Sequence, residues 1–333
     1  MKKVIKTILF LSLTLPLLAG SKPVWPQPPE KTRIAYEKSI SKAEDLDIKK
    51  GFFAKIWDFF AGHEEKILIK PFGVHFDSGK IYVTDIGTRS LFIFDTKRKK
   101  LKIIEGFKSQ KFASPIDVTT DKKGNIYVTD SMLGYVLVFD RMGNPLRKIG
   151  TSKKILRPTG IAYNKEKNTI YVTDTLSADI KIFTPEGKYI SSIGGPGNSD
   201  GKFNRPTFIT IDEEGNLYVS DSMNQRIQIF DKKGRFLRKF GKLGNTIGSF
   251  SNPRGVAVDK YGNIYVTDTL FHAVQIFNKK GDLLLVFGSY GEKEGEFVVP
   301  EDISITPDGT IYVTDSYNMR VQVFKITDYN DEK

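Results

Sequence analysis

Six aspartates form the most regular set of potential ligand groups in this chain of 333 residues. Each ends a copy of the pentapeptide Ile/Leu-Tyr-Val-Thr/Ser-Asp, so a ring of carboxylates around a cation is one chemistry that they offer. Residues that recur in every unit usually encode the repeat itself, which favours a structural role. We expect each carboxylate to accept hydrogen bonds from backbone N–H groups in the turn after its strand. The six residues are Asp85, Asp130, Asp174, Asp221, Asp268 and Asp315.

Three other acids depart from the repeat. Asp117 and Asp302 occupy the second position after a proline, where related units have glycine, and Glu301 adjoins Asp302. If the units close into a ring, the two that carry these acids flank the first unit, so we expect the acids to converge near a channel mouth. Their oxygens suit Ca²⁺, although that ion takes six to eight oxygen ligands. Ca²⁺ at these acids is the alternative to our main prediction, which is that no cofactor is bound.

Histidine and cysteine chemistry is scarce in this chain. The absence of cysteine excludes disulfides, thiolate metal sites and a cysteine nucleophile. The histidines are His63, His75 and His272, too few for a histidine-ligated zinc site in a channel. His75 stands where the other units have Thr, Ala or Ser, and we expect it to be packed and hydrogen-bonded. We therefore name no catalytic residue.

The pentapeptides recur at a nearly constant interval, and this period predicts the fold that positions these groups. The steps between their tyrosines are 45, 44, 47, 47 and 47 residues. A period in this range, with several short strands per unit, is typical of a β-propeller. One unit, 252–288, reads as four strands separated by turn residues. We predict an all-β, six-bladed propeller over 66–333 with four strands per blade.

The sixth unit ends one strand short. After its third strand at 320–325 the chain has only ITDYNDEK left, whereas residues 33–40 alternate apolar and polar side chains without belonging to any unit. We predict that 33–40 completes the sixth blade beside 320–325. This pairing would close the ring and leave no half-built edge exposed.

The units resemble the NHL repeat family. Units four to six carry its pattern best, as GKFNRP with SDSMNQRIQIFD, GSFSNPRGVAVD with YVTDTLFHAVQIF, and GEFVVP with YVTDSYNMRVQVF. Units one to three lack the Asn-x-Arg of units four and six. The resemblance implies a six-bladed propeller over 66–325. It implies no single function, because propellers host binding proteins, lyases and hydrolases alike.

The N-terminus has the features of an export signal. Three lysines precede the apolar run 8–20, which is too short to span a bilayer and fits a secretory signal. The end of the run, 18–21, is similar to a bacterial lipoprotein signal, but Ser21 stands where the lipidated cysteine would be. We predict a signal peptide over 1–21 and an exported bacterial protein, periplasmic or attached to the cell envelope. An uncleaved anchor is the alternative.

Two segments separate the signal from the repeats. Residues 22–32 hold four prolines and are expected to form an extended tether. Within 33–65, the stretch 51–61 has an apolar face at helical spacing, so we predict a short amphipathic helix that packs on the propeller. Peripheral membrane contact through 52–60 is the alternative, which the lack of a basic polar face disfavours.

Loop residues on one face of the ring are the remaining candidates for binding. Connectors between units and loops between second and third strands emerge together, and they are rich in arginine and aromatic residues, as protein interfaces are. The net charge is +12, but export argues against nucleic acid. We predict a monomeric, non-catalytic scaffold for a protein or an extracytoplasmic polymer. The alternative is a metal-dependent lactonase or lyase-type propeller enzyme with an acidic channel site. The predicted contact residues are Arg89, Tyr135, Arg157, Arg205, Arg226, Arg254, Phe271, His272, Tyr317 and Arg320.

Overall fold

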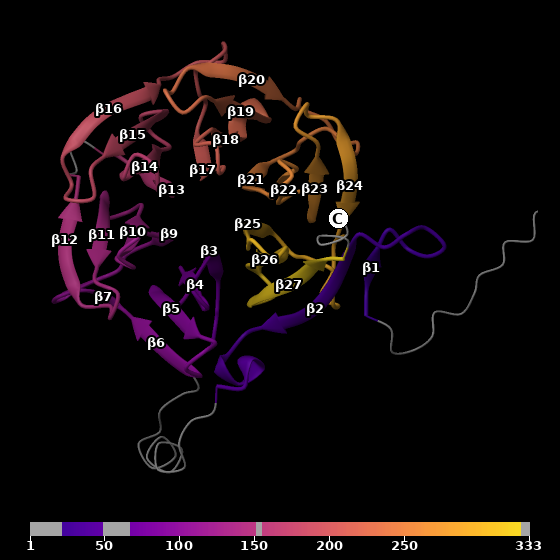
Figure 1. Cartoon of the computed structure of the whole chain (residues 1–333), viewed down its shortest axis with the longest axis horizontal. Helices are drawn as coiled ribbons and strands as arrows, with labels where there is room; N and C mark the ends of the chain where they lie inside the picture. The colour runs from indigo at the N-terminus through magenta and orange to yellow at the C-terminus, as the bar shows by residue number, and fades with distance from the viewer. Residues whose placement is uncertain (1–21, 49–66, 151–154, 328–333) are drawn as a thin grey trace, which may run out of the picture.

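The computed structural model describes residues 22–48, 67–150 and 155–327, which form six antiparallel sheets around a central axis (Figure 1). The prediction of an all-β, six-bladed propeller is confirmed. The helices of the described chain are the short 3₁₀ segments η1 (Ala43–Leu46) and η2 (Ser222–Asn224). No helix in these ranges is long and apolar enough to cross a membrane.

Each blade runs from an inner strand at the axis to an outer strand at the rim. Blade 1 consists of β3 (Pro71–Asp77), β4 (Lys80–Asp85), β5 (Ser90–Asp95) and β6 (Lys100–Ile104). A small hairpin of β7 (Gly106–Phe107) and β8 (Gln110–Lys111) precedes blade 2, which consists of β9 (Pro115–Thr120), β10 (Ile126–Asp130), β11 (Tyr135–Phe139) and β12 (Pro145–Ile149). Blade 3 consists of β13 (Pro158–Asn164), β14 (Thr169–Asp174), β15 (Asp179–Phe183) and β16 (Tyr189–Gly194). Blade 4 consists of β17 (Pro206–Ile211), β18 (Leu217–Asp221), β19 (Arg226–Phe230) and β20 (Phe236–Phe240). Blade 5 consists of β21 (Pro253–Val258), β22 (Ile264–Asp268), β23 (Ala273–Phe277) and β24 (Leu283–Phe287), and blade 6 begins with β25 (Pro300–Ile305), β26 (Thr310–Asp315) and β27 (Arg320–Ile326).

The N-terminal strand closes the ring as predicted. β2 (Ile34–Ile40) pairs antiparallel with β27, with Ile34 opposite Ile326 and Ile40 opposite Val321. In Figure 1 the indigo strand from the start of the chain lies along the yellow strand from its end. The last blade is thereby built from an N-terminal strand that precedes the repeats and the three strands of the sixth unit.

The proline-rich segment is more than the expected tether. β1 (Val24–Trp25) pairs with β2 and extends blade 6 to five strands. The Trp25 ring packs against Phe287 and Phe324, with centroid distances of 5.7 and 5.9 Å. This aromatic contact fixes part of 22–32 on the blade, which corrects the tether prediction. The predicted signal peptide at 1–21 and the predicted helix at 51–61 lie outside the described residues.

The repeated pentapeptide supplies the contacts between blades. Its Ile81 and Val83 pack into the apolar cluster that blade 1 shares with blade 6, whereas Tyr82 points the other way, into the cluster shared with blade 2. Alternation of side chains along a strand makes this division automatic. At the axis, Thr84 donates to the carbonyl of Ile116 in the next blade (2.7 Å). The recurrence of Ile, Tyr, Val and Thr therefore follows from one interface repeated around the ring.

Candidate functional site

The loops that carry most of the candidate residues lie on one face of the ring, here called the upper face. It consists of the connectors between blades and the loops between second and third strands. The lower face consists of the turns between first and second strands and between third and fourth strands. The inner strands run from the upper face to the lower face along the axis.

The six repeated aspartates hold the upper face together. Asp85 is fully buried, and its Oδ2 accepts from the backbone N–H groups of Ile69 (2.7 Å) and Lys70 (3.0 Å). Its Oδ1 accepts from the N–H of Thr88 in the turn after β4 (2.8 Å). The expected structural role is confirmed, and it extends further than expected, because each carboxylate also ties the preceding connector to its blade. The equivalent contacts are made by Asp130, Asp174, Asp221, Asp268 and Asp315.

Two of the predicted contact residues are used inside their own blades. Arg226 is only 5 % exposed, and its Nε donates to Asp221 Oδ2 at 2.8 Å. Its other nitrogens donate to backbone carbonyl groups of the connector 198–202 at 2.8–2.9 Å. Arg320 makes the equivalent contacts in blade 6. The Asn-x-Arg motif of units four and six therefore clamps the long connector loops of those blades.

The other predicted contact residues differ in how far they reach into solvent. Tyr317 is 57 % exposed, and Lys70 Nζ lies 4.6 Å from the centre of its ring. His272 is half-buried because its ring packs on Tyr290 and its Nδ1 accepts from the N–H of Val299 (3.2 Å). The exposed residues of the set also include Arg89, Arg157 and Arg205, and the half-buried ones include Tyr135, Arg254 and Phe271.

Large apolar side chains also stand out from the upper face, and only Tyr317 among them was named from the sequence. They occupy the second position after the pentapeptide in five of the six units, and their exposed fractions run from 51 to 76 %. The first unit has Gly87 at this position. The spacing from each repeated aspartate was the signal that could have found them. This set, here called the apolar ring, comprises Met132, Leu176, Met223, Leu270 and Tyr317.

A cavity of about 450 Å³ occupies the lower part of the channel. Its wall comes from the second half of each inner strand and from the following turns, so it opens toward the lower face. Above it the channel is filled. Phe208 of β17 is 2 % exposed and stacks on Phe72 of β3, with a centroid distance of 6.1 Å. The upper face and the cavity are therefore separate sites.

The acids predicted to converge do so in part. Asp302 Oδ2 accepts from the N–H of Val74 (2.9 Å), while Asp117 Oδ1 would lie 3.0 Å from a Cβ added at Gly73, so both carboxyl groups border the same two residues of β3. Both line the cavity. Glu301 instead faces Arg254, in an ion pair at 3.1 Å. Within the described ranges, no three His, Asp or Glu side chains are grouped so that they could hold a metal ion.

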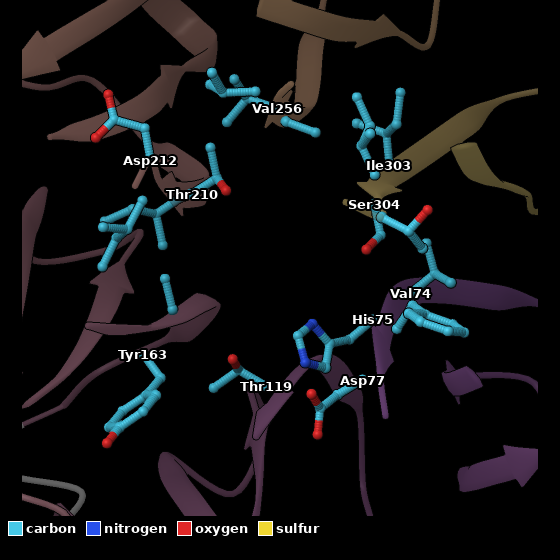
Figure 2. A pocket seen from close by; sticks show the side chains of 18 of the residues that line it. Val74, His75, Asp77, Thr119, Tyr163, Thr210, Asp212, Val256, Ile303 and Ser304 are labelled. Carbon is cyan, nitrogen blue, oxygen red and sulfur yellow. The ribbon is translucent and has the colours of Figure 1, made fainter. Parts of the chain in front are cut away.

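Burial changes the protonation of the groups in the cavity. Burial raises the pKa of Asp117 to about 7, although the N–H groups of Ile161 and Val118 oppose the shift. Burial, followed by the charge of Asp117, raises the pKa of Asp302 well above its usual value. Burial lowers the pKa of His75 to about 4, so its imidazole is neutral near pH 7. Figure 2 shows this ring pointing into the cavity beside Thr119.

Comparison with models of known families identifies the family to which the chain belongs. A model of the SMP-30/gluconolactonase/LRE-like region matches residues 70–241, which is blades 1 to 4. The chain belongs to the SMP-30/gluconolactonase/LRE-like family. The NHL repeat matches residues 250–277 and 297–324, in blades 5 and 6, so the predicted resemblance to NHL repeats is confirmed. This SMP-30/gluconolactonase-like propeller thus carries both signatures along one uninterrupted ring.

Its relatives have diverse names. The chain is 32% identical over 155 residues to a probable peptidyl-alpha-hydroxyglycine alpha-amidating lyase of Caenorhabditis elegans, a match that covers 42% of this chain and 41% of the relative. It is 29% identical over 119 residues to a gluconolactonase of Zymomonas mobilis, covering 32% of this chain and 33% of that enzyme. It thus spans well under half the length of these relatives.

A solved structure of streptogramin B lyase shares the fold. It superimposes with a TM-score of 0.60 at 14% identity and covers 78% of this chain and 94% of that one. At such low identity the likeness establishes the propeller alone.

Proposed function

We propose that this chain is an exported, non-catalytic scaffold that binds a partner protein on its upper face. The observation that carries the proposal is the apolar ring, because five large apolar side chains exposed at one repeated loop position give one face of the propeller apolar surface that a partner could bury. Gly87 stands at the same position in blade 1, so the fold itself does not require a large side chain there. Five exposed apolar residues at one turn position therefore call for another explanation.

The charges beside the apolar ring indicate which partner fits. Arg89, Arg157 and Arg205 are exposed on the same face, where the repeated aspartates are buried and Glu301 pairs with Arg254. The connector before blade 6 also exposes Glu292 and Glu294, next to Lys293. A partner segment with carboxylates between apolar side chains would complement this face in both respects. We therefore propose an acidic, partly apolar protein segment as the occupant.

Two methionines of blade 2 provide a matched test. Met132 belongs to the apolar ring and is 76 % exposed, whereas Met142 is 58 % exposed in a turn on the lower face. A photo-crosslinking amino acid at position 132 should capture an acidic partner that the same amino acid at position 142 does not. With the purified partner, Met132→Asp should weaken binding about 10-fold or more, because it adds a repelling charge to an apolar contact. Met142→Asp should leave the affinity unchanged. Equal capture at both positions would overturn the proposal.

An enzyme of lactonase or lyase type is the second candidate. The match to the gluconolactonase-like family and the cavity that combines His75 with two carboxyl groups favour it. Purified protein can be assayed for proton release from gluconolactone, with and without added Ca²⁺, beside His75→Ala. Turnover that disappears in His75→Ala would replace the non-catalytic proposal.

A further inference from the structure

The channel cavity carries an inference that does not depend on the upper face. Its volume of about 450 Å³ lies within the range of small-molecule sites, roughly 300–1,000 Å³. Its closed end is formed by Asp117 and Asp302, and the stacked rings of Phe72 and Phe208 separate it from the partner-binding face. A ligand would enter from the lower face only.

The two carboxyl groups lack a compensating positive charge. Each accepts a backbone N–H from the next blade, Asp117 from Ile161 (2.8 Å) and Asp302 from Val74 (2.9 Å). Neither forms an ion pair with a lysine or arginine in the described part of the chain, where Arg254 pairs with Glu301 instead. Burying ionised carboxylates without a cation is unfavourable, so such a pair either keeps a proton or takes up a cation.

His75 adds a third acceptor to the same cavity. Its Nε2 lies 3.0 Å from Thr120 Oγ1, and with Nε2 donating to this hydroxyl the other nitrogen, Nδ1, is left as an acceptor. No hydrogen bond to a described residue uses Nδ1, and the ring points into the cavity (Figure 2). The two carboxyl groups at the closed end fit a ligand group that donates hydrogen bonds, and the hydroxyl groups of Thr119, Thr210 and Ser304 along the wall can donate or accept.

We propose that the cavity binds a small organic cation, with its ammonium or amidinium group on Asp117 and Asp302. The rest of the ligand would contact apolar wall residues such as Ile209, Val256 and Ile303. A metal ion fits less well, because the described residues offer no third carboxylate or histidine at that point. The neutral imidazole of His75 would accept from the ligand, as neutral acceptors do in sites that recognise N–H groups.

The charges at the cavity mouth favour the same sign of ligand. Four acids and two lysines line the cavity along its lower part, which leaves an excess of negative charge where a ligand enters. A cleft lined by one sign of charge concentrates ligands of the opposite sign. The six residues are Asp77, Lys165, Asp212, Glu213, Asp259 and Lys260.

Benzamidine and benzamide test the proposal, because they share shape and differ in charge. Isothermal titration of the full-length protein near pH 8 should give a dissociation constant for benzamidine about 10-fold or more below that for benzamide. Asp302→Asn should remove this preference. Ser304→Leu, which adds bulk to the wall and leaves both carboxyl groups in the chain, should weaken both ligands. Glu214→Gln is the matched control, because Glu214 is exposed on the same turn as Glu213 and does not line the cavity.

The pH dependence adds a readout that a merely apolar pocket would not give. A cation that displaces the proton held by the carboxyl pair should bind about 10-fold more tightly near pH 8 than near pH 6. The titratable and charged groups around the pair that could modify this change are Glu301 and Arg254 above it and Asp77, Lys165 and the neutral His75 below it. Equal affinity for benzamide, tight Ca²⁺ binding that excludes benzamidine, or no benzamidine binding at about 20 mM would each overturn the proposal.

Discussion

Replacing Asp117 by Asn should reverse the order of stability of the two proteins between acidic and neutral pH. The pKa of this carboxyl is about 7 in the folded protein, because of burial, against 3.8 for an unperturbed aspartate. The folded state therefore holds a proton that the unfolded state has already released. Within this window the free energy of unfolding falls as the pH rises, and asparagine abolishes that loss.

The magnitude follows from the two pKa values. A window of about 3 pH units at 1.36 kcal/mol per unit gives a loss of about 4 kcal/mol, complete above pH 7, as an upper limit. Against this, the Asn amide nitrogen must face the N–H of Val118 or Ile161, and losing that acceptor costs about 1–3 kcal/mol at every pH. Asp117→Asn should therefore be the less stable protein near pH 4 and the more stable one near pH 8, by about 2 kcal/mol in each case.

Urea denaturation followed by circular dichroism at a series of pH values measures this reversal. Asp308→Asn is the control of opposite sign. Burial alone would raise the pKa of Asp308, but the hydrogen bonds from Lys325, Thr306 and Thr310 and the charge of Lys325 together outweigh it and lower this pKa to about 2. The contribution of Asp308 to stability is therefore present above pH 4 and disappears as the pH falls through 2. A difference between wild type and Asp117→Asn that does not change with pH would refute the reasoning about the buried pair.

Three further predictions test the frame around the two sites. Truncation through residue 40 should lower the melting temperature far more than truncation through residue 32. The longer truncation removes β2 and exposes the edge of β27, whereas the shorter one removes only β1 and the packing of Trp25. Equal melting temperatures would contradict the closure of the ring by β2. Arg226→Ala should destabilise by about 3–5 kcal/mol in chemical denaturation, since it leaves a buried carboxylate unpaired, while Arg89→Ala on the surface should stay within about 0.5 kcal/mol. Phe208→Ala should cost about 3–5 kcal/mol by leaving a cavity where the ring stacks on Phe72, and a loss below about 1 kcal/mol would show that the channel is open there.

The sequence predicts the frame well because the frame is repeated. Strand order, the four-strand blade and the closing strand all follow from comparing six copies, in which chance variation averages out. The pairing of 33–40 with 320–325 was predictable because the sixth copy lacked one strand. The place of Trp25 was not predictable in this way, because it depends on contacts with Phe287 and Phe324. These two residues are far from Trp25 along the chain and come close to it in space only when the ring is closed.

The candidate site was predicted less well, because the residue composition of a loop does not show which way its side chains point. Arg226 and Arg89 both belong to loops of the upper face, yet one side chain turns back onto its connector and the other enters solvent. The distinction depends on backbone carbonyl groups of a long connector, which the connectors before blades 4 and 6 present to Arg226 and Arg320. The apolar ring was readable in the sequence, but only after position within the turn, rather than residue type, was compared from unit to unit.

One position of the inner strands varies between units, and its larger residues line or block the channel. At the third position of these strands glycine alternates with a larger residue around the ring, and each glycine lies where a Cβ would meet the next blade. Added at Gly73, a Cβ would lie 2.5 Å from the carbonyl oxygen of Ile116, and at Gly160 it would lie 2.6 Å from that of Thr207. Every second blade therefore approaches its neighbour closely at this position, and only the other three blades carry a side chain there. Those three carry Asp117, Phe208 and Asp302. Phe208 fills the channel above the cavity, and Asp117 and Asp302 form the closed end of the cavity. The aromatic ring that blocks the channel and the carboxyl groups that would bind the ligand therefore occupy the same strand position, in blades 4, 2 and 6 respectively.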